Sequence, residues 1–178
     1  RYVPNGRKVY LENGVEAVSY RRKKKEIRRK PGDTAIHEAK HACVAEKKKT
    51  GSVRRASIVP GPGFLGITEM HFMTAAAAAA PDADHMHGTG HDVRIVEMMG
   101  VSLSAARSEA RSIMAQCEDE IEETAYQLEE KKDMSGSEIR QAMRDGENRY
   151  EEVIFLRSPR GEVQEFVQQV TKVPILLS

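Results

Sequence analysis

The sequence predicts an α+β fold that is mainly helical, with a small β-sheet beside one of the helices. Three observations support this class. Apolar residues recur every three or four positions from Ser104 to Lys131, as on one face of an amphipathic helix. Residues 74–80 are a threonine followed by six alanines, and alanine has the highest helix propensity. β-branched residues lie on both sides of a Pro-Gly-Pro-Gly turn at 60–63, a pattern typical of two paired strands.

The N-terminal region is expected to form a hairpin and a basic arm. Residues 1–20 contain two short alternating segments separated by Asn13-Gly14, a frequent hairpin turn. Residues 21–30 carry eight Lys or Arg and one Glu, whereas the chain as a whole has 28 basic and 27 acidic residues. We interpret residues 1–32 as an N-terminal hairpin followed by a basic arm.

A helix is predicted from residue 33 to about residue 48, and it contains His-Glu-Ala-Lys-His at 37–41. At about 100° per residue, His41 lies about 40° and Glu38 about 100° around the helix from His37, so the three share one arc. Two imidazoles four positions apart can bind one Zn²⁺, and the carboxylate between them can take a proton from metal-bound water. The alternative interpretation is a surface helix with this order of residues by chance.

Two strands and another helix are predicted next. The strands cover residues 57–59 and 64–68 and are joined by the Pro/Gly turn. The helix covers residues 74–80, and we expect Pro81 to end it because proline has no backbone N–H. The polar, glycine-containing segment 82–92 is expected to be a loop.

The remaining chain is predicted to be helical up to about residue 145. We expect a short helix at 92–99, one long amphipathic helix at 104–131, and a short helix at 139–143 that follows a Ser-x-x-Glu capping box. Residues 146–178 hold two apolar clusters and form a C-terminal segment without a structural assignment.

Composition excludes several classes of protein. No stretch reaches the roughly 18–20 apolar residues that span a bilayer, and no secretory signal is visible, so we expect a cytoplasmic protein without a membrane span. Cys43 and Cys117 are 74 positions apart and are interpreted as small core residues rather than as a disulfide or a Cys-type zinc site. No Gly-x-x-x-x-Gly-Lys-Ser/Thr loop is present, so no ATPase is expected in this chain.

Three segments make the chain resemble the peptidase domain of the FtsH-type zinc metalloproteases, the M41 peptidases. Residues 34–42 are similar to the zinc-binding helix of that family. Residues 57–60 followed by 65–68 resemble the strand and turn beside its active-site cleft, and residues 90–93 resemble the segment whose Asp is the third zinc ligand. The resemblance implies that residues 33–145 form an M41-like, zincin-like metallopeptidase core, with the small sheet beside the zinc helix.

The resemblance also implies a site and a reaction. His37, His41 and Asp92 would be the ligands of Zn²⁺, and a carboxylate oxygen is a competent third ligand. Glu38 would be the catalytic general base that assists the attack of zinc-bound water on a peptide bond. The chain would therefore be a zinc metalloendopeptidase that hydrolyses protein or peptide substrates.

The same resemblance implies how substrate and partners bind. Phe64, Leu65 and Gly66 would bind an extended substrate at the edge of their strand by β-augmentation. Hydrolysis would be independent of ATP in this chain, unless an ATPase or unfoldase partner delivers the substrate. A homo-oligomer is a second possible arrangement.

The third ligand has alternatives among nearby residues. Glu69 follows His41 by 28 positions, a spacing that a Glu-ligated site uses. Three histidines could replace Asp92 or form a second metal site, and otherwise are solvated loop residues: His85, His87 and His91.

Two other functions compete with the peptidase. Lys40 stands where the family has glycine, and the helix projection places it on the metal side opposite Glu38, which favours a catalytically inactive M41-like binding or adaptor module. The basic arm at 21–30 could instead bind nucleic-acid phosphates, with zinc as structural support. A solvated arm without a ligand is the simpler interpretation of the same residues.

Overall fold

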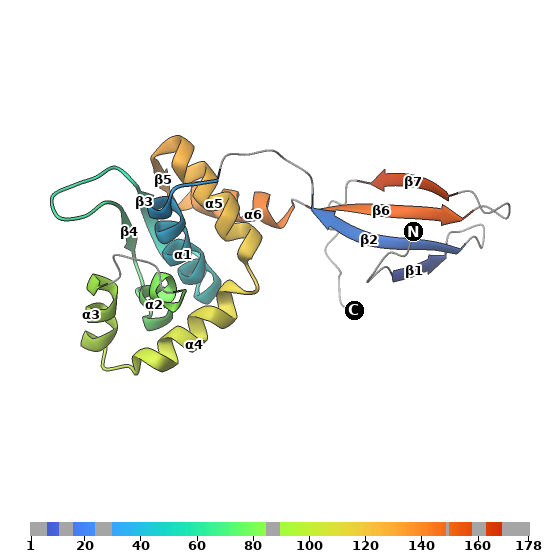
Figure 1. Ribbon diagram of the computed structural model, residues 1–178. Helices are drawn as coiled ribbons and strands as arrows, with labels where there is room; N and C mark the ends of the chain where they lie inside the picture. The colour runs from blue at the N-terminus through green and yellow to red at the C-terminus, as the bar shows by residue number, and fades with distance from the viewer. Residues whose placement is uncertain are drawn as a thin grey trace. The chain divides into compact units, whose positions relative to one another are not determined.

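The fold is described from a computed structural model of the chain, shown in Figure 1. It describes residues 7–10, 16–23, 30–84, 90–148, 150–157 and 163–168. The chain divides into two compact units, one of residues 1–27 with 148–178 and the other of residues 28–147. Each unit is described by itself.

The unit of residues 28–147 is mainly helical with a small antiparallel sheet, as the sequence predicts. Its helices are α1 (Asp33–Lys48), α2 (Ala75–Ala83), α3 (Gly90–Met98), α4 (Leu103–Met114), α5 (Glu118–Lys131) and α6 (Gly136–Glu147). Its strands are β3 (Val53–Ser57), β4 (Ile67–Met70) and β5 (Asp133–Ser135), in the order β4-β3-β5. Within the described chain, no helix is both long and apolar enough to cross a lipid bilayer.

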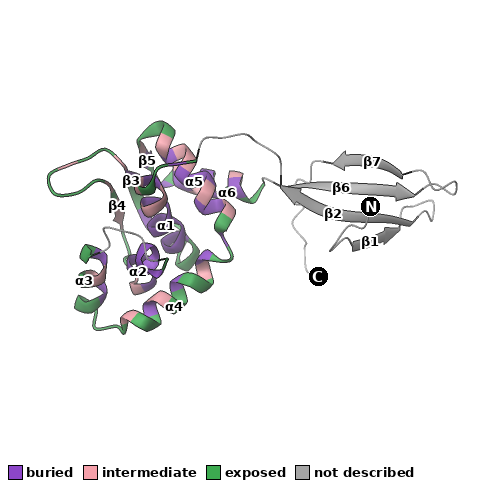
Figure 2. Cartoon of the chain, in the orientation of Figure 1, coloured by how far each residue is buried: buried purple, intermediate pink, exposed green. Residues whose placement is uncertain are grey.

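Small residues build the core around α1. Figure 2 shows α1 and α2 as the most continuously buried helices of this unit. Both contribute alanines to one cluster, which also receives Leu128 from α5, Met134 from β5 and Ile139 from α6. Alanine side chains allow helices to approach closely, so α1 and α2 lie near enough for backbone groups of one to reach side chains of the other. The alanine run is therefore a close-packed helix, which Thr74 caps by accepting a hydrogen bond from the Ala77 N–H at 3.1 Å.

The prediction that Pro81 ends this helix is wrong, because α2 continues to Ala83. Proline at position 81 cannot donate to the carbonyl of Ala77, four residues earlier. That carbonyl instead lies 2.7 Å from Nδ1 of His41. A side chain from α1 thus replaces the missing helical hydrogen bond, and the buried carbonyl keeps a partner.

The prediction of one helix over 104–131 is also wrong. α4 ends at Met114, Cys117 has a non-helical φ of −137°, and α5 begins at Glu118. Three acidic residues fill the first turn of α5. Carboxylates at this place stabilise a helix N-terminus through the helix dipole, which favours a new start here over continuation of α4.

The strands are displaced from the predicted ranges 57–59 and 64–68. β3 ends at Ser57 and β4 begins only at Ile67. Between them, Gly61 and Phe64 pair through both N–H groups, at 3.1 and 3.3 Å. The prolines of this segment have no N–H to offer a sheet, so the chain forms a loop with a tight turn instead of continuing the ladder.

The capping box is confirmed, but the helix behind it is longer than predicted. The Ser135 N–H donates to Glu138 Oε2 at 2.9 Å, and the Glu138 N–H donates back to Ser135 Oγ at 3.4 Å. α6 then extends to Glu147 rather than ending near residue 143.

The other unit is a four-stranded antiparallel sheet. Its strands are β1 (Arg7–Tyr10), β2 (Glu16–Lys23), β6 (Tyr150–Arg157) and β7 (Val163–Gln168), in the order β1-β2-β6-β7. The N-terminal hairpin is confirmed, although its Asn13-Gly14 turn lies outside the described residues. The C-terminal segment, for which the sequence predicts no secondary structure, supplies β6 and β7, and β6 pairs with β2. The basic arm starts within β2, and residues 24–29 of it lie outside the described residues.

Candidate metal centre

Three predicted ligands lie together in the helical unit. His37 and His41 are one turn apart on α1, and Asp92 is in the first turn of α3. The Nε2 atoms of the two histidines are 3.2 Å apart. His37 Nε2 lies 3.3 Å from Asp92 Oδ2, and His41 Nε2 lies 3.4 Å from Asp92 Oδ1. Among the described residues these three form the group that could hold a metal ion, with ligand atoms within 4.8 Å of one another.

Apolar packing positions Asp92 opposite the histidines. Val96, one turn after Asp92 on α3, is fully buried against Ala78 and Ala79 of α2 and Ala106 of α4. The same helix α2 packs against α1, which carries the histidines. Because α3 packs against α2 and α2 packs against α1, this packing determines the distance between the Asp92 carboxylate and the two imidazoles.

The backbone of α2 determines the tautomer of His41. A carbonyl oxygen accepts hydrogen bonds and cannot donate, so the His41 Nδ1 at 2.7 Å from the Ala77 oxygen must carry the proton. In the neutral ring, Nε2 is then unprotonated and its lone pair points at the cluster. This is the arrangement found in metal-binding histidines, whose second nitrogen donates to a carbonyl or carboxylate.

The Asp92 carboxylate provides the test of whether a metal fits. Its Oδ2 atom is buried and accepts no hydrogen bond of regular geometry from the described residues, although His37 Nε2 lies 3.3 Å away. A buried carboxylate oxygen without a partner is costly, and a bound cation removes that cost. Two imidazole nitrogens and one carboxylate oxygen are a donor set that suits Zn²⁺ and leaves a fourth position for water or substrate. The residues present therefore fit the metal.

Electrostatics within the cluster point the same way. Burial favours the neutral form of Asp92, but its contacts with His37 and His41 outweigh burial and hold its pKa well below the ordinary value. Burial likewise disfavours charge on His41, yet the hydrogen bond and charge of Asp92 raise the pKa of that imidazole. The carboxylate is thus ionised and attracts positive charge, whether a proton or a metal ion.

Glu38 lies buried beside the cluster and is held by β4. Thr68 Oγ1 donates to Glu38 Oε2 at 2.7 Å. Burial raises the pKa of Glu38, while Thr68 and then the two histidines oppose that rise. A carboxylate with a raised pKa is suited to accept and return a proton.

Gly66 explains how the chain approaches Glu38 so closely. A Cβ atom at this position would lie 2.7 Å from Glu38 Oε1 and 2.9 Å from Thr34 Cγ2. Only glycine fits between the loop and the helix without displacing one of them. Predicted as a substrate-binding residue, Gly66 lies against Glu38, whereas Phe64 and Leu65 lie in the preceding loop and are exposed.

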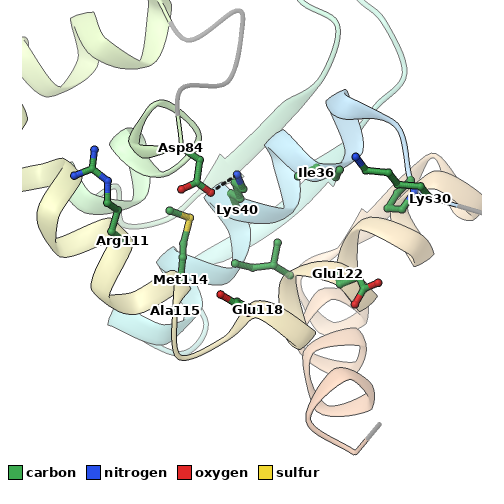
Figure 3. A pocket seen from close by; sticks show the side chains of 11 residues that line it. Lys30, Ile36, Lys40, Asp84, Arg111, Met114, Ala115, Glu118 and Glu122 are labelled. Atoms are coloured by element: carbon green, nitrogen blue, oxygen red, sulfur yellow. Dashed lines mark hydrogen bonds and ion pairs between the residues drawn. The ribbon is translucent and has the colours of Figure 1, made fainter. Parts of the chain in front are cut away.

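Lys40 is directed elsewhere. Its Nζ lies 2.6 Å from Asp84 Oδ2, and Figure 3 shows this ion pair at the wall of a pocket of about 450 Å³. Ile36, Met114 and Ile121 supply the apolar lining of that pocket. None of the three candidate ligands lines it. The expectation that the Lys40 charge faces the metal side is therefore wrong, because Asp84 at the end of α2 binds it.

Two of the alternative ligands, Glu69 and His91, are described and are not part of the cluster. Glu69 lies 3.6 Å from Arg55 across the sheet, and His91 is exposed although its neighbour Asp92 is buried. His85 and His87 lie outside the described residues.

The sequence does not predict two of the residues that contact the site. It predicts Thr68 only as part of a strand and gives no sign that the Thr68 hydroxyl binds Glu38. Ala77 acts through its backbone carbonyl, for which a side-chain pattern gives no signal. The proline four residues after Ala77 is the one local sign that this carbonyl lacks its usual donor.

Comparison with known proteins adds no family to this description. No protein-family model matches the chain, and no curated protein is significantly similar to it. The function is therefore inferred from the site itself.

Proposed function

We propose that this chain is a zinc-dependent metallopeptidase with a zincin-like, FtsH-type site, which acts on protein or peptide substrates in the cytoplasm. The observation that carries the proposal is the buried Asp92 Oδ2, which accepts no hydrogen bond and lies 3.3 Å from His37 Nε2. This oxygen and the Nε2 atoms of His37 and His41 are three candidate ligand atoms that point toward one another, and the carboxylate of Glu38 is buried beside them. Among the residues that the structure describes, the group has three candidate protein ligands and not four, which supports a catalytic rather than a structural zinc site.

Each residue has a distinct part in the reaction. His37, His41 and Asp92 would hold the ion, which acts as a Lewis acid and lowers the pKa of a water molecule. Glu38 would take a proton from the attacking water and return it to the amine of the leaving peptide. Thr68 holds one oxygen of Glu38, so the orientation of that carboxylate is determined before substrate binds.

The sheet beside the site suits an extended substrate. β4 is an outer strand of the sheet β4-β3-β5, and an outer strand can pair with a peptide backbone. The loop before β4 carries Phe64 and Leu65, which are 40% and 70% exposed, next to Gly66 and thus to Glu38. Apolar side chains of a peptide would contact this loop. An ATPase or unfoldase partner, or a second copy of the chain, would help to deliver folded substrates.

The alternatives have less support. The inactive-module interpretation depended on Lys40, which is bound by Asp84. The nucleic-acid interpretation depends on the basic arm, and residues 21–23 of that arm lie in β2, whose backbone pairs with β6.

The test is zinc stoichiometry combined with peptide cleavage. We expect one Zn²⁺ per chain, and cleavage of a fluorogenic peptide or casein that falls by about 10²–10⁴-fold in Glu38→Gln while zinc is retained. Glu69→Gln, at a half-buried glutamate paired with Arg55, is the matched control and should keep both properties. A wild-type chain that binds no zinc, or a Glu38→Gln variant that cleaves at the normal rate, would contradict the proposal.

A further inference from the structure

We infer that Pro81 is a positioning residue for the metal site. By withholding a backbone N–H from the Ala77 carbonyl, it reserves that carbonyl for His41 and so selects which nitrogen of the His41 ring carries the proton. The part of this inference that concerns zinc rests on the proposed function. The part that concerns the tautomer of His41 stands on the metal-free protein alone.

The geometry joins three buried groups. In an α-helix the N–H of each residue donates to the carbonyl four residues earlier, so the donor for Ala77 would come from position 81. Proline has no N–H, and its ring also crowds the carbonyl four residues back. The Ala77 oxygen lies 2.7 Å from His41 Nδ1. Ala77 and Pro81 are fully buried and His41 is 7% exposed, so water does not replace either partner.

The consequence is a choice between two imidazole tautomers. With the Ala77 carbonyl available, the proton of neutral His41 resides on Nδ1, and Nε2 offers a lone pair. With an N–H at position 81, the helix would supply its own donor to Ala77 and compete with His41. The other tautomer would place a proton on Nε2, which faces His37 Nε2 at 3.2 Å, and this proton would have to leave before a metal ion could bind.

The position of this proline in its helix supports a role in the site. Proline is well tolerated in the first turn of a helix, where the N–H groups lack partners anyway. Pro81 is instead the seventh residue of α2, and the helix continues for two residues beyond it. Pro81 leaves the Ala77 carbonyl without a helical donor, and His41 contacts this same carbonyl of α2. One exchange of partners thus keeps the helix continuous and orients a candidate ligand.

The experiment measures the tautomer and the metal affinity in Pro81→Ala and Pro81→Val. Both variants restore an N–H; alanine is smaller than proline and valine is larger, so that the pair separates the effect of the N–H from the effect of a cavity. In metal-free protein, at a pH well above the raised pKa of His41, ¹⁵N chemical shifts should show its neutral ring as the Nδ1–H tautomer in the wild type. We expect the variants to shift toward Nε2–H and to bind Zn²⁺ about tenfold more weakly in a chelator competition.

A matched control separates this effect from a general disturbance of α2. Ala79→Gly weakens the same helix at a buried position but leaves the Ala77 carbonyl and its partners unchanged. It should keep the Nδ1–H tautomer and a zinc affinity within twofold of the wild type. Pro81 variants that fold and retain the wild-type tautomer would overturn the inference. A wild-type chain that binds no zinc would contradict the proposed function, and the tautomer measurement would still decide the role of Pro81.

Discussion

Two buried carboxylates, Glu46 of α1 and Asp92 of α3, have different hydrogen-bond partners. Glu46, near the C-terminal end of α1, accepts hydrogen bonds from the Gly51 and Val53 N–H groups at 2.8 Å and lies 3.4 Å from Arg140. Asp92 faces the histidines nearer the other end, and its Oδ2 accepts no hydrogen bond from the described residues. A carboxylate whose oxygens are satisfied by the chain belongs to the framework. One left unsatisfied, beside two imidazoles, indicates a site for a cation.

The partners of Glu46 explain its structural role. It binds the first N–H groups of the turn and strand that follow α1, and it also pairs with Arg140 of α6. Three segments are therefore held at one point. Asp92 makes no comparable connection, because both of its contacts are with candidate ligands of the same ion.

The same chemical change at both positions should separate these roles, and its largest effect is expected at Asp92. Asp92→Asn removes one candidate ligand charge, so we expect zinc affinity to fall by more than about 100-fold, beyond the usual loss for groups that only support a ligand. Without metal, the unfolding free energy should stay within about 1 kcal/mol of the wild type, since an amide can donate to an imidazole nitrogen. Calorimetric zinc titration and urea unfolding of metal-free protein measure the two quantities. Unchanged zinc affinity would remove Asp92 from the site.

Glu46→Gln should show the opposite pattern. The amide N–H₂ group would face a backbone N–H that now donates to a carboxylate, so we expect the unfolding free energy to fall by about 2 kcal/mol without metal. Zinc affinity should remain within about twofold, because Glu46 contacts none of the candidate ligands. The same urea and zinc titrations measure both. A variant as stable as the wild type would show that buried hydrogen bonds do not distinguish the two carboxylates.

Glu38 lies between these cases, because its one described side-chain partner is Thr68. The hydrogen bond from Thr68 favours the ionised form, so its loss in Thr68→Val should raise the already elevated pKa of Glu38 further. Since the base must be ionised to act, the acidic limb of the pH–activity profile should move to higher pH, by about one unit. Thr68→Ser keeps the hydroxyl and should keep the wild-type profile. A shift toward lower pH in the valine variant would contradict this role of Thr68.

The sequence predicts which residues lie together at the candidate metal centre better than it predicts the bounds of the elements around it. Helical periodicity places His37, Glu38 and His41 on one arc of α1, because these residues are close in the chain and share one regular helix. Only the family resemblance predicts Asp92 as a ligand, and the structure places its carboxylate oxygens within 3.4 Å of the Nε2 atoms of both histidines. The position of Asp92 depends on α3 packing against α2 and on α2 packing against α1, which no local pattern encodes.

The misplaced elements have tertiary or competing local causes. The break at Cys117 follows from acidic residues that favour a new helix start, although the apolar spacing continues through it. Pro81 stays inside α2 because a side chain from another helix replaces the lost donor. The pairing of β2 with β6 joins segments more than 120 positions apart, so only the folded chain reveals it.

The alanines between α1 and α2 limit which substitutions can be tolerated in evolution. Ala39 and Ala80 have no exposed surface, and the alanines packed around them have no side-chain rotamers that could make room. A larger side chain at either position therefore cannot be accommodated by local readjustment. The two helices would have to separate as rigid bodies, and the hydrogen bond across them would lengthen. Homologues that conserve the candidate metal ligands should therefore conserve small residues at these positions too, even though those side chains have no part in the proposed reaction.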